Sequence, residues 1–310
     1  MNLSERQLLK LYITSLYEVQ KLRIQISNRV EDFKRRGGET EVDMAEELKL
    51  RLFDLANKME KNIAEDVAKA VAKYPVMRWL EKVNGIGPRL GGSLVGTLQD
   101  ISNYPNVSSL WAYCGMGVIT VCSECKKRAF PDDQVIARQR FLQTQIERRW
   151  RSHCIKEEIE EGTPIDDEFS LEARGDTIKA LCSCDDPDVI SSAPSKQYYS
   201  GLLLDYNPFL RMTCWKISNQ FVKQGKYYRQ VYVDYKEYYT ERDGGRLTKG
   251  HINNRALRAV VKLFLSHLYY MWSKSEGINP GQIYLQFKLG DEEFDKTHSY
   301  KSPPFHDMFD

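Results

Sequence analysis

The stretch VNGIGPRLGGSL, from Val83 to Leu94, places two glycines around one isoleucine and follows them directly with a proline. Glycine is the default residue where the backbone takes a positive φ or approaches another backbone closely, and proline suits the first turn of a helix. The segment before it carries apolar residues at Val76, Trp79 and Leu80, which is helical spacing. The sequence therefore predicts two short helices joined by a tight turn at NGIG.

This pair of helices has the outline of a helix-hairpin-helix, in which the turn amides and the start of the second helix point at a phosphate. On that interpretation Gly85, Ile86, Gly87 and Arg89 are nucleic-acid-binding residues. The alternative is a plain helical corner, in which the two glycines only turn the chain. The position of Arg89 beside the turn favours DNA.

Composition limits the class of protein. The 310 residues include 45 Lys and Arg against 43 Asp and Glu, so a net charge of +2 gives no sign of a nucleic-acid partner by itself. No apolar run approaches the ~20 residues of a membrane span, and the first ten residues lack the pattern of a signal peptide. We expect a cytoplasmic protein whose seven cysteines are thiols or metal ligands and not disulfides.

Residues 1–73 show two helical stripes of apolar residues, one from Leu9 to Phe33 and one from Met44 to Val67. The pattern breaks between them at RRGGET, which contains Gly37 and Gly38. These stripes predict a coiled-coil-like antiparallel hairpin. Its apolar seam needs either the rest of the chain or a second copy as a partner, and we expect a homo-oligomer through this hairpin.

Two close cysteine pairs lie in the middle of the chain. They are Cys122 and Cys125 in CSEC, and Cys182 and Cys184 in CSC. The C-x2-C spacing lets two thiolates face one Zn²⁺, and four thiolates complete a structural site with no open position for catalysis. The alternatives are four unliganded thiols, or a site in which His153 or Cys154 replaces one member of the second pair.

The cysteine pairs enclose a charged helix over Gln134–Glu160, and the next clear helix begins at about Pro208. We therefore expect residues 74–283 to form a nucleic-acid-binding domain with a cysteine-rich insert at about 118–204. Residues 284–310 are acidic and broken by prolines, which predicts an extended tail. The fold class is mainly α.

Basic residues gather in the C-terminal half. Between Asp205 and Lys262 there are twelve Lys or Arg against five acids, with tyrosines among them. Such a mixture suits phosphate contacts combined with stacking on bases or sugars, and the alternative is a solvated helix face with half-buried tyrosines. The predicted nucleic-acid-binding residues of this half are Arg211, Lys216, Lys249, His251, Arg255, Arg258 and Lys262.

Several segments follow one another in order over roughly the last two thirds of the chain: VNGIGPRLGGSLVGTLQDI, LWAYCGMGV, YNPFLRMTCWKISNQFVKQGKYYRQVYVDYKE and KGHINNRALRAVVKLFLSHL. In this order they resemble the C-terminal transposase domain of the Piv-type DNA invertases and their insertion-sequence relatives, the RNA-guided serine transposases. The matching residues are Gly85, Ile86, Gly87, Tyr113, Gly115, Arg211 and Tyr228 to Tyr232. The cysteine-bearing block resembles the zinc-ribbon insert of some orphan members. The resemblance implies a fold that binds DNA or RNA.

The chain departs from that family at the residues of its chemistry. The RuvC-like domain with its metal-binding acids has no counterpart in this sequence, and Phe209 stands at the position of the family's nucleophilic serine. Ser200 and Ser218 are about two helical turns away, some 11 Å, which is too far to substitute simply. We therefore expect no strand transfer.

The sequence thus favours a zinc-stapled nucleic-acid-binding protein derived from a transposase domain, with DNA as the expected ligand more than RNA. One alternative is an active serine-type transposase or recombinase with a relocated nucleophile. Another is a mobile-element or phage factor that binds and modulates a host protein through the N-terminal hairpin and the acidic tail.

Overall fold

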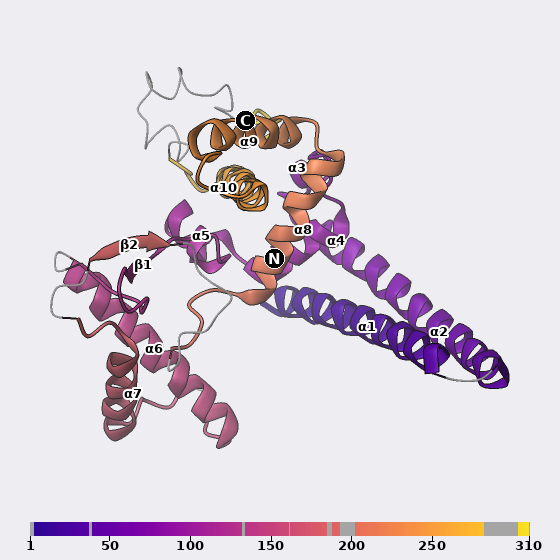
Figure 1. Cartoon of the computed structure of the whole chain (residues 1–310), viewed down its shortest axis with the longest axis horizontal. Coiled ribbons are helices and arrows are strands. Elements are labelled where there is room, and N and C mark those ends of the chain that lie inside the picture. Colours follow the sequence, from indigo (N-terminus) through magenta and orange to yellow (C-terminus); the bar gives the residue numbers. More distant parts are fainter. Residues whose placement is uncertain are drawn as a thin grey trace. The chain divides into compact units, whose positions relative to one another are not determined.

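The computed structural model describes most of the chain and is mainly helical, as predicted (Figure 1). The described residues are 3–36, 39–131, 134–160, 162–184, 188–192, 202–281 and 303–309. Contacts divide the chain into two compact units: unit 1 comprises Met1–Val107 and Met212–Asp310, and unit 2 comprises Ser108–Arg211. Each unit is described by itself below.

Unit 1 begins with two long helices, α1 (Leu3–Arg36) and α2 (Glu39–Val71), which lie side by side in Figure 1. This confirms the predicted helical hairpin, while Gly37 and Gly38 of its turn lie outside the described residues. The buried apolar residues of this hairpin include Leu9, Ile13 and Val67, which lie against the glycines of the later helix Pro88–Leu98. The outer side of α2 exposes Leu48, Leu52, Leu55 and Met59 by 39–58 %, so oligomerisation through this hairpin stays a prediction.

The stretch VNGIGPRLGGSL and the residues just before it form α3 (Met77–Leu80), a turn and α4 (Pro88–Leu98). Gly85 takes a φ of +93°, which a side chain would make costly, and extended Gly87 precedes Pro88 at the first position of α4. The later glycines have another purpose. A Cβ at Gly96 would meet Ile13 and would lie 3.0 Å from Leu9 Cγ, so the missing side chain lets α4 pack closely on α1.

The core of unit 1 lies where α8 (Pro208–Gln224), α9 (Tyr227–Asp243) and α10 (Lys249–Ser275) bury aromatic rings. Trp79 stacks on Phe264 with ring centroids 6.0 Å apart, and Phe221 stacks on Tyr228 at 4.4 Å. A short 3-10 helix, η1 (Ile101–Asn103), contacts α10. The unit boundary falls within α8.

The end of the predicted acidic tail packs on its own chain. Residues 284–302 lie outside the described part, whereas residues 303–309 form turns. The indole nitrogen of Trp79 donates a hydrogen bond to the Pro304 carbonyl at 2.6 Å, and Lys274 donates to the His306 carbonyl at 3.1 Å. The terminal segment is therefore folded onto α3 and α10, and is not extended over residues 303–309.

Unit 2 contains α5 (Val107–Tyr113, with its first residue in unit 1), β1 (Ile119–Cys122), α6 (Val135–Lys156), α7 (Asp167–Ala180) and β2 (Val189–Ser192). The strands pair antiparallel with Cys122 opposite Val189. One apolar cluster of this unit consists of Phe141, Leu142, Ala180, Leu181 and Leu202 with Phe130 packed against it. Leu110, Trp111 and Met116 are also buried in this unit.

None of the helices in the described part of the chain combines the length and the apolarity that a bilayer crossing requires.

Candidate metal centre and basic surface

The first cysteine pair lies on a tight turn that closes the end of β1. The Cys122 amide donates to the Lys127 carbonyl at 2.9 Å, and the Lys126 amide donates back to the Cys122 carbonyl at 3.1 Å. Lys126 takes a positive φ of 58°, which turns the chain sharply after Cys125. The turn therefore brings both sulfurs of the C-x2-C pair to one side.

The second pair is held against the first by backbone hydrogen bonds. Cys182 follows the end of α7, and its amide donates to the Arg128 carbonyl at 2.9 Å. The amide of Cys184 donates to the Cys182 sulfur at 3.4 Å. Just before β2, the carbonyl of Asp188 accepts a hydrogen bond from the Ser123 amide at 2.7 Å. The β1–β2 pairing thus carries the two pairs to one place although ~56 residues separate them in the chain.

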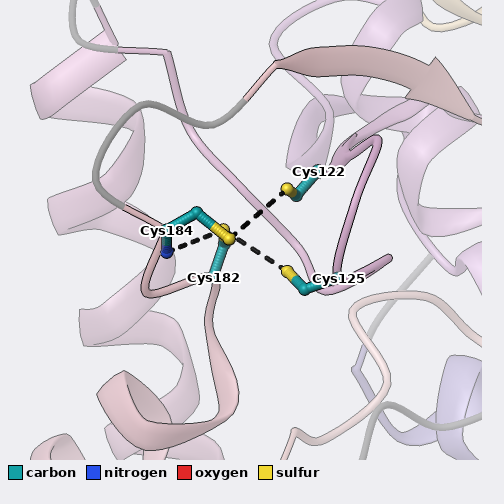
Figure 2. Close-up of side chains that lie close together, drawn as sticks. All are labelled: Cys122, Cys125, Cys182 and Cys184. Carbon is teal, nitrogen blue, oxygen red and sulfur yellow. Dashed lines mark hydrogen bonds between the residues drawn. The ribbon is translucent and has the colours of Figure 1, made fainter.

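The four sulfurs face one another, as Figure 2 shows, and all lie within 4.8 Å of each other. The Sγ–Sγ distances are 3.4 Å for Cys125–Cys182 and 3.9 Å for Cys122–Cys184, and all four thiols are free. Four thiolates around a tetrahedral metal with bonds of about 2.3 Å would stand about 3.8 Å apart. The predicted cluster of four cysteines is confirmed, and these residues are close enough to bind a metal ion.

His153 and Cys154, the predicted substitutes, lie on α6 and are not members of this cluster. The His153 ring stacks on Phe169 of α7 with centroids 5.1 Å apart, and it also contacts Trp150. His153 and Phe169 line a cavity between α6 and α7 that Arg149 and Glu172 also border. His153 therefore takes part in helix packing, and the four cysteines meet without it.

The protonation of the cysteines is uneven. Backbone amides of Cys125 and Glu124 donate to the Cys122 sulfur and lower its pKa to about 7. Hydrogen bonds with the thiols of Cys182, Cys122 and Cys125 raise the pKa of Cys184 to about 12. One thiolate is thus favoured near neutral pH without metal, and a bound cation would draw the remaining protons off because metal ligation requires thiolates.

A second feature lies at the junction of α9 and α10 in unit 1. Asp243, the last residue of α9, has a side chain only 3 % exposed, and three arginines donate to it. Arg242, Arg246 and Arg255 each place a guanidinium nitrogen 2.7 Å from a carboxylate oxygen. Hydrogen bonds from Arg242 and Arg246 lower the pKa of Asp243 to about 2. We call these four residues the Asp243 cluster.

The predicted basic residues of α10 lie at different depths. Lys249 and His251 are exposed in the first turn, where the helix-capping Thr248 hydroxyl lies 3.0 Å from His251 Nδ1. Arg255 belongs to the Asp243 cluster, and Arg258 is half-buried. Burial lowers the pKa of Lys262 to about 8, with a smaller contribution from Arg258. The exposed basic residues therefore concentrate at the start of α10.

Two of the predicted nucleic-acid-binding residues outside α10, Arg211 and Lys216, interact with other residues of the protein. The Arg211 guanidinium donates to the Gly115 carbonyl at 3.3 Å and lies over the Tyr206 ring at 5.1 Å. The Lys216 ammonium lies 4.4 Å from the centroid of Tyr17. Both cations hold together elements of their own unit.

Residues in and beside the turn between α3 and α4 also contact other parts of the protein. Ile86 is only 4 % exposed, and its amide donates to the Val83 carbonyl at 3.0 Å. Arg89 forms an ion pair with Glu60 of α2. Gly87 remains exposed at the start of α4, where the first amides of a helix lack intrahelical partners.

Sequence reasoning did not single out Asp243, Arg242 or Arg246. The signal was present in ERDGGR, where Asp243 directly follows Arg242 and two glycines separate it from Arg246. The third partner, Arg255, is twelve residues further on, so only the pairing of α9 with α10 reveals the cluster.

Comparison of the chain with family models, with curated proteins and with solved structures found no match.

Proposed function

We propose that this protein binds nucleic acid through the exposed surface at the junction of α9 and α10, and that Zn²⁺ staples unit 2. The observation that carries the binding proposal is the Asp243 cluster. One buried carboxylate holds three guanidiniums, which leaves two positive charges in excess at one point of the surface.

The arginines are both fixed and accessible. The side chains of Arg242 and Arg255 are 46 % exposed and that of Arg246 is 77 % exposed, while Asp243 is almost fully covered. Hydrogen bonds to the carboxylate restrict the guanidiniums, so less conformational entropy is lost when they meet a ligand. Guanidinium groups bind phosphate oxygens in pairs of parallel hydrogen bonds, and Lys249 lies close in sequence with a further exposed charge.

The proposed zinc site follows from the donor set. Four sulfur ligands within 4.8 Å of one another suit Zn²⁺ better than Mg²⁺ or Ca²⁺, which prefer oxygen. A closed site of this kind has a structural role. The resemblance to transposase C-terminal domains supports a nucleic-acid ligand as well, and Phe209 at the serine position supports binding without strand transfer.

The test is salt-dependent binding of labelled DNA to the full chain and to Arg246→Gln. Arg246 is chosen because it is the most exposed of the three arginines, and its loss leaves Asp243 with two partners. We expect weaker binding to unrelated sequences alike, and a slope of log K against log salt that is smaller by about 1.

Arg29→Gln, an exposed arginine on α1, is the matched control and should leave both quantities unchanged. Equal slopes for the Arg246 variant and the wild type would contradict the role of the Asp243 cluster. Absence of binding to any nucleic acid at low salt would remove the proposed function.

A further inference from the structure

Beside the Asp243 cluster, α9 carries a group of tyrosine rings. Tyr235 and Tyr239 stack with centroids 6.1 Å apart and planes inclined by 17°, and Tyr238 meets Tyr239 edge-on at 5.3 Å. Tyr235 and Tyr239 are half-buried, and burial raises the pKa of both hydroxyls, that of Tyr235 to about 12. Tyr238 is 45 % exposed and offers its ring to the surface.

Arg242 connects these rings to the phosphate-binding arginines. Its guanidinium carbon lies 5.2 Å from the Tyr238 centroid and 5.0 Å from the Tyr239 centroid. The same guanidinium donates to Asp243 at 2.7 Å and to the Tyr238 hydroxyl at 3.4 Å. An exposed ring and an excess of positive charge are therefore held together in a fixed arrangement over one turn of α9.

We propose that the nucleic acid bound at this surface is single-stranded, with an unpaired base stacked on Tyr238 and its neighbouring phosphates held by the Asp243 cluster. This inference rests on the proposed function. The bases of a duplex cover each other's faces, so a surface ring can stack only on a base that is unpaired or splayed out. Phosphate contacts alone would serve a duplex equally well, and the exposed ring is what distinguishes the two ligands.

Stacking on a tyrosine carries little base preference because every base has a π-face. The surface therefore fits single-stranded DNA and single-stranded RNA alike, and it binds them without reading sequence. The rival role for the ring is to shield the Asp243 cluster from water. In that case its removal would change the stability of the fold and would weaken all nucleic acids equally.

The experiment measures fluorescence anisotropy of three labelled probes of one mixed sequence: single-stranded DNA, single-stranded RNA and blunt duplex DNA. The proteins are the full chain and its Tyr238→Ala and Tyr238→Phe variants. We expect the full chain to bind both single strands more tightly than the duplex. Tyr238→Ala should lose about 5- to 150-fold in single-strand affinity, as expected for one stacked base, with the duplex affinity unchanged. Tyr238→Phe should keep the wild-type affinity.

The matched control is Tyr270→Ala. The Lys274 ammonium lies over the Tyr270 ring at 5.9 Å, and these two residues are four apart in sequence, as Tyr238 and Arg242 are. Tyr270, however, lies about 22 Å along α10 from Arg255. Its loss should change no affinity. The inference would be overturned if the full chain bound the duplex as tightly as the single strands. It would also be overturned if Tyr238→Ala lost affinity equally for all three probes. In either case Arg246→Gln still tests the proposed function. If no probe binds at low salt, both fail together.

Discussion

His267 of α10 shows how a single buried residue makes the fold sensitive to pH. It is fully buried, and its Nδ1 lies 2.9 Å from the Tyr228 hydroxyl. Burial lowers the pKa of His267 to about 3 from its usual 6.5. In the unfolded chain His267 therefore binds a proton below about pH 6.5, whereas in the folded chain it binds one only below about pH 3.

Because the folded pKa is depressed, the free energy of unfolding should fall as pH drops through this window. We expect a slope that approaches about 1.4 kcal/mol per pH unit below about pH 5.5, and a total loss of about 2 kcal/mol between pH 6.5 and 4.5. Denaturant titrations at several pH values measure the free energy of unfolding. The pH values chosen stay above the range where Asp243 becomes protonated. His267→Asn, which keeps a polar partner for Tyr228, should be less stable but should lose this slope.

His251→Asn provides the control, since His251 is exposed at the start of α10. It should retain the acid slope of the wild type. Parallel stability curves for the wild type and His267→Asn would show that His267 does not cause the pH dependence.

At the scale of elements, the glycines of α4 determine how closely three helices approach. A Cβ at Gly92 would lie 2.8 Å from Val67 of α2, and one at Gly96 would meet Ile13 of α1. Gly96→Ala should therefore destabilise unit 1 by about 1–2 kcal/mol, because overpacking costs more than the better helix propensity of alanine returns. Denaturant unfolding measures the change.

Ile13→Val removes the Cδ1 atom that the new methyl group would meet, so it should rescue Gly96→Ala. The double variant should be more stable than the sum of the two single changes predicts. If the two changes in the free energy of unfolding simply added, the contact between α4 and Ile13 would not be what excludes a side chain at residue 96.

The elements that the sequence predicted well are those with a long local pattern. The stripes of α1 and α2 follow from periodicity, and the turn at Gly85 follows from its glycines and the proline after them. The C-x2-C spacing pointed to Cys122 and Cys125. The sequence did not reveal α7 or the two short strands. Their apolar patterns are weak, since α7 buries only Ala173, Thr177 and Ala180, and strand pairing joins distant segments.

The candidate basic site was predicted only in outline. Charge counting located the region, but it could not separate Arg255, which faces a buried carboxylate, from Arg211, which holds Gly115 inside unit 2. The same difficulty applies to Ile86, whose place in the family pattern says nothing of its burial in the core. Burial and pairing depend on tertiary contacts, and one sequence carries no local signal for them.

At the scale of the whole molecule, the four cysteines that lie close enough to bind a metal all belong to unit 2. Unit 1 buries large aromatic residues such as Trp79, Phe264 and Trp272, and Trp79 stacks on Phe264. Unit 2 contains the apolar cluster around Phe141 and Leu142, two four-residue strands and the four cysteines. A metal bound to the four cysteines would add to the stability of unit 2, because it binds only the folded arrangement of its ligands.

Removal of the metal should therefore unfold unit 2 and spare unit 1. Elemental analysis should find about one Zn²⁺ per chain in protein purified without chelator. After chelation, hydrogen exchange should accelerate at the amides of β1, α6 and α7, while amides in the middle of α10 keep their protection. Cys125→Ser should show the fast exchange without chelator, whereas Cys154→Ser, a cysteine outside the cluster, should behave as the wild type. Protein that carries no metal and yet protects α6 and α7 fully would show that packing alone holds unit 2 together.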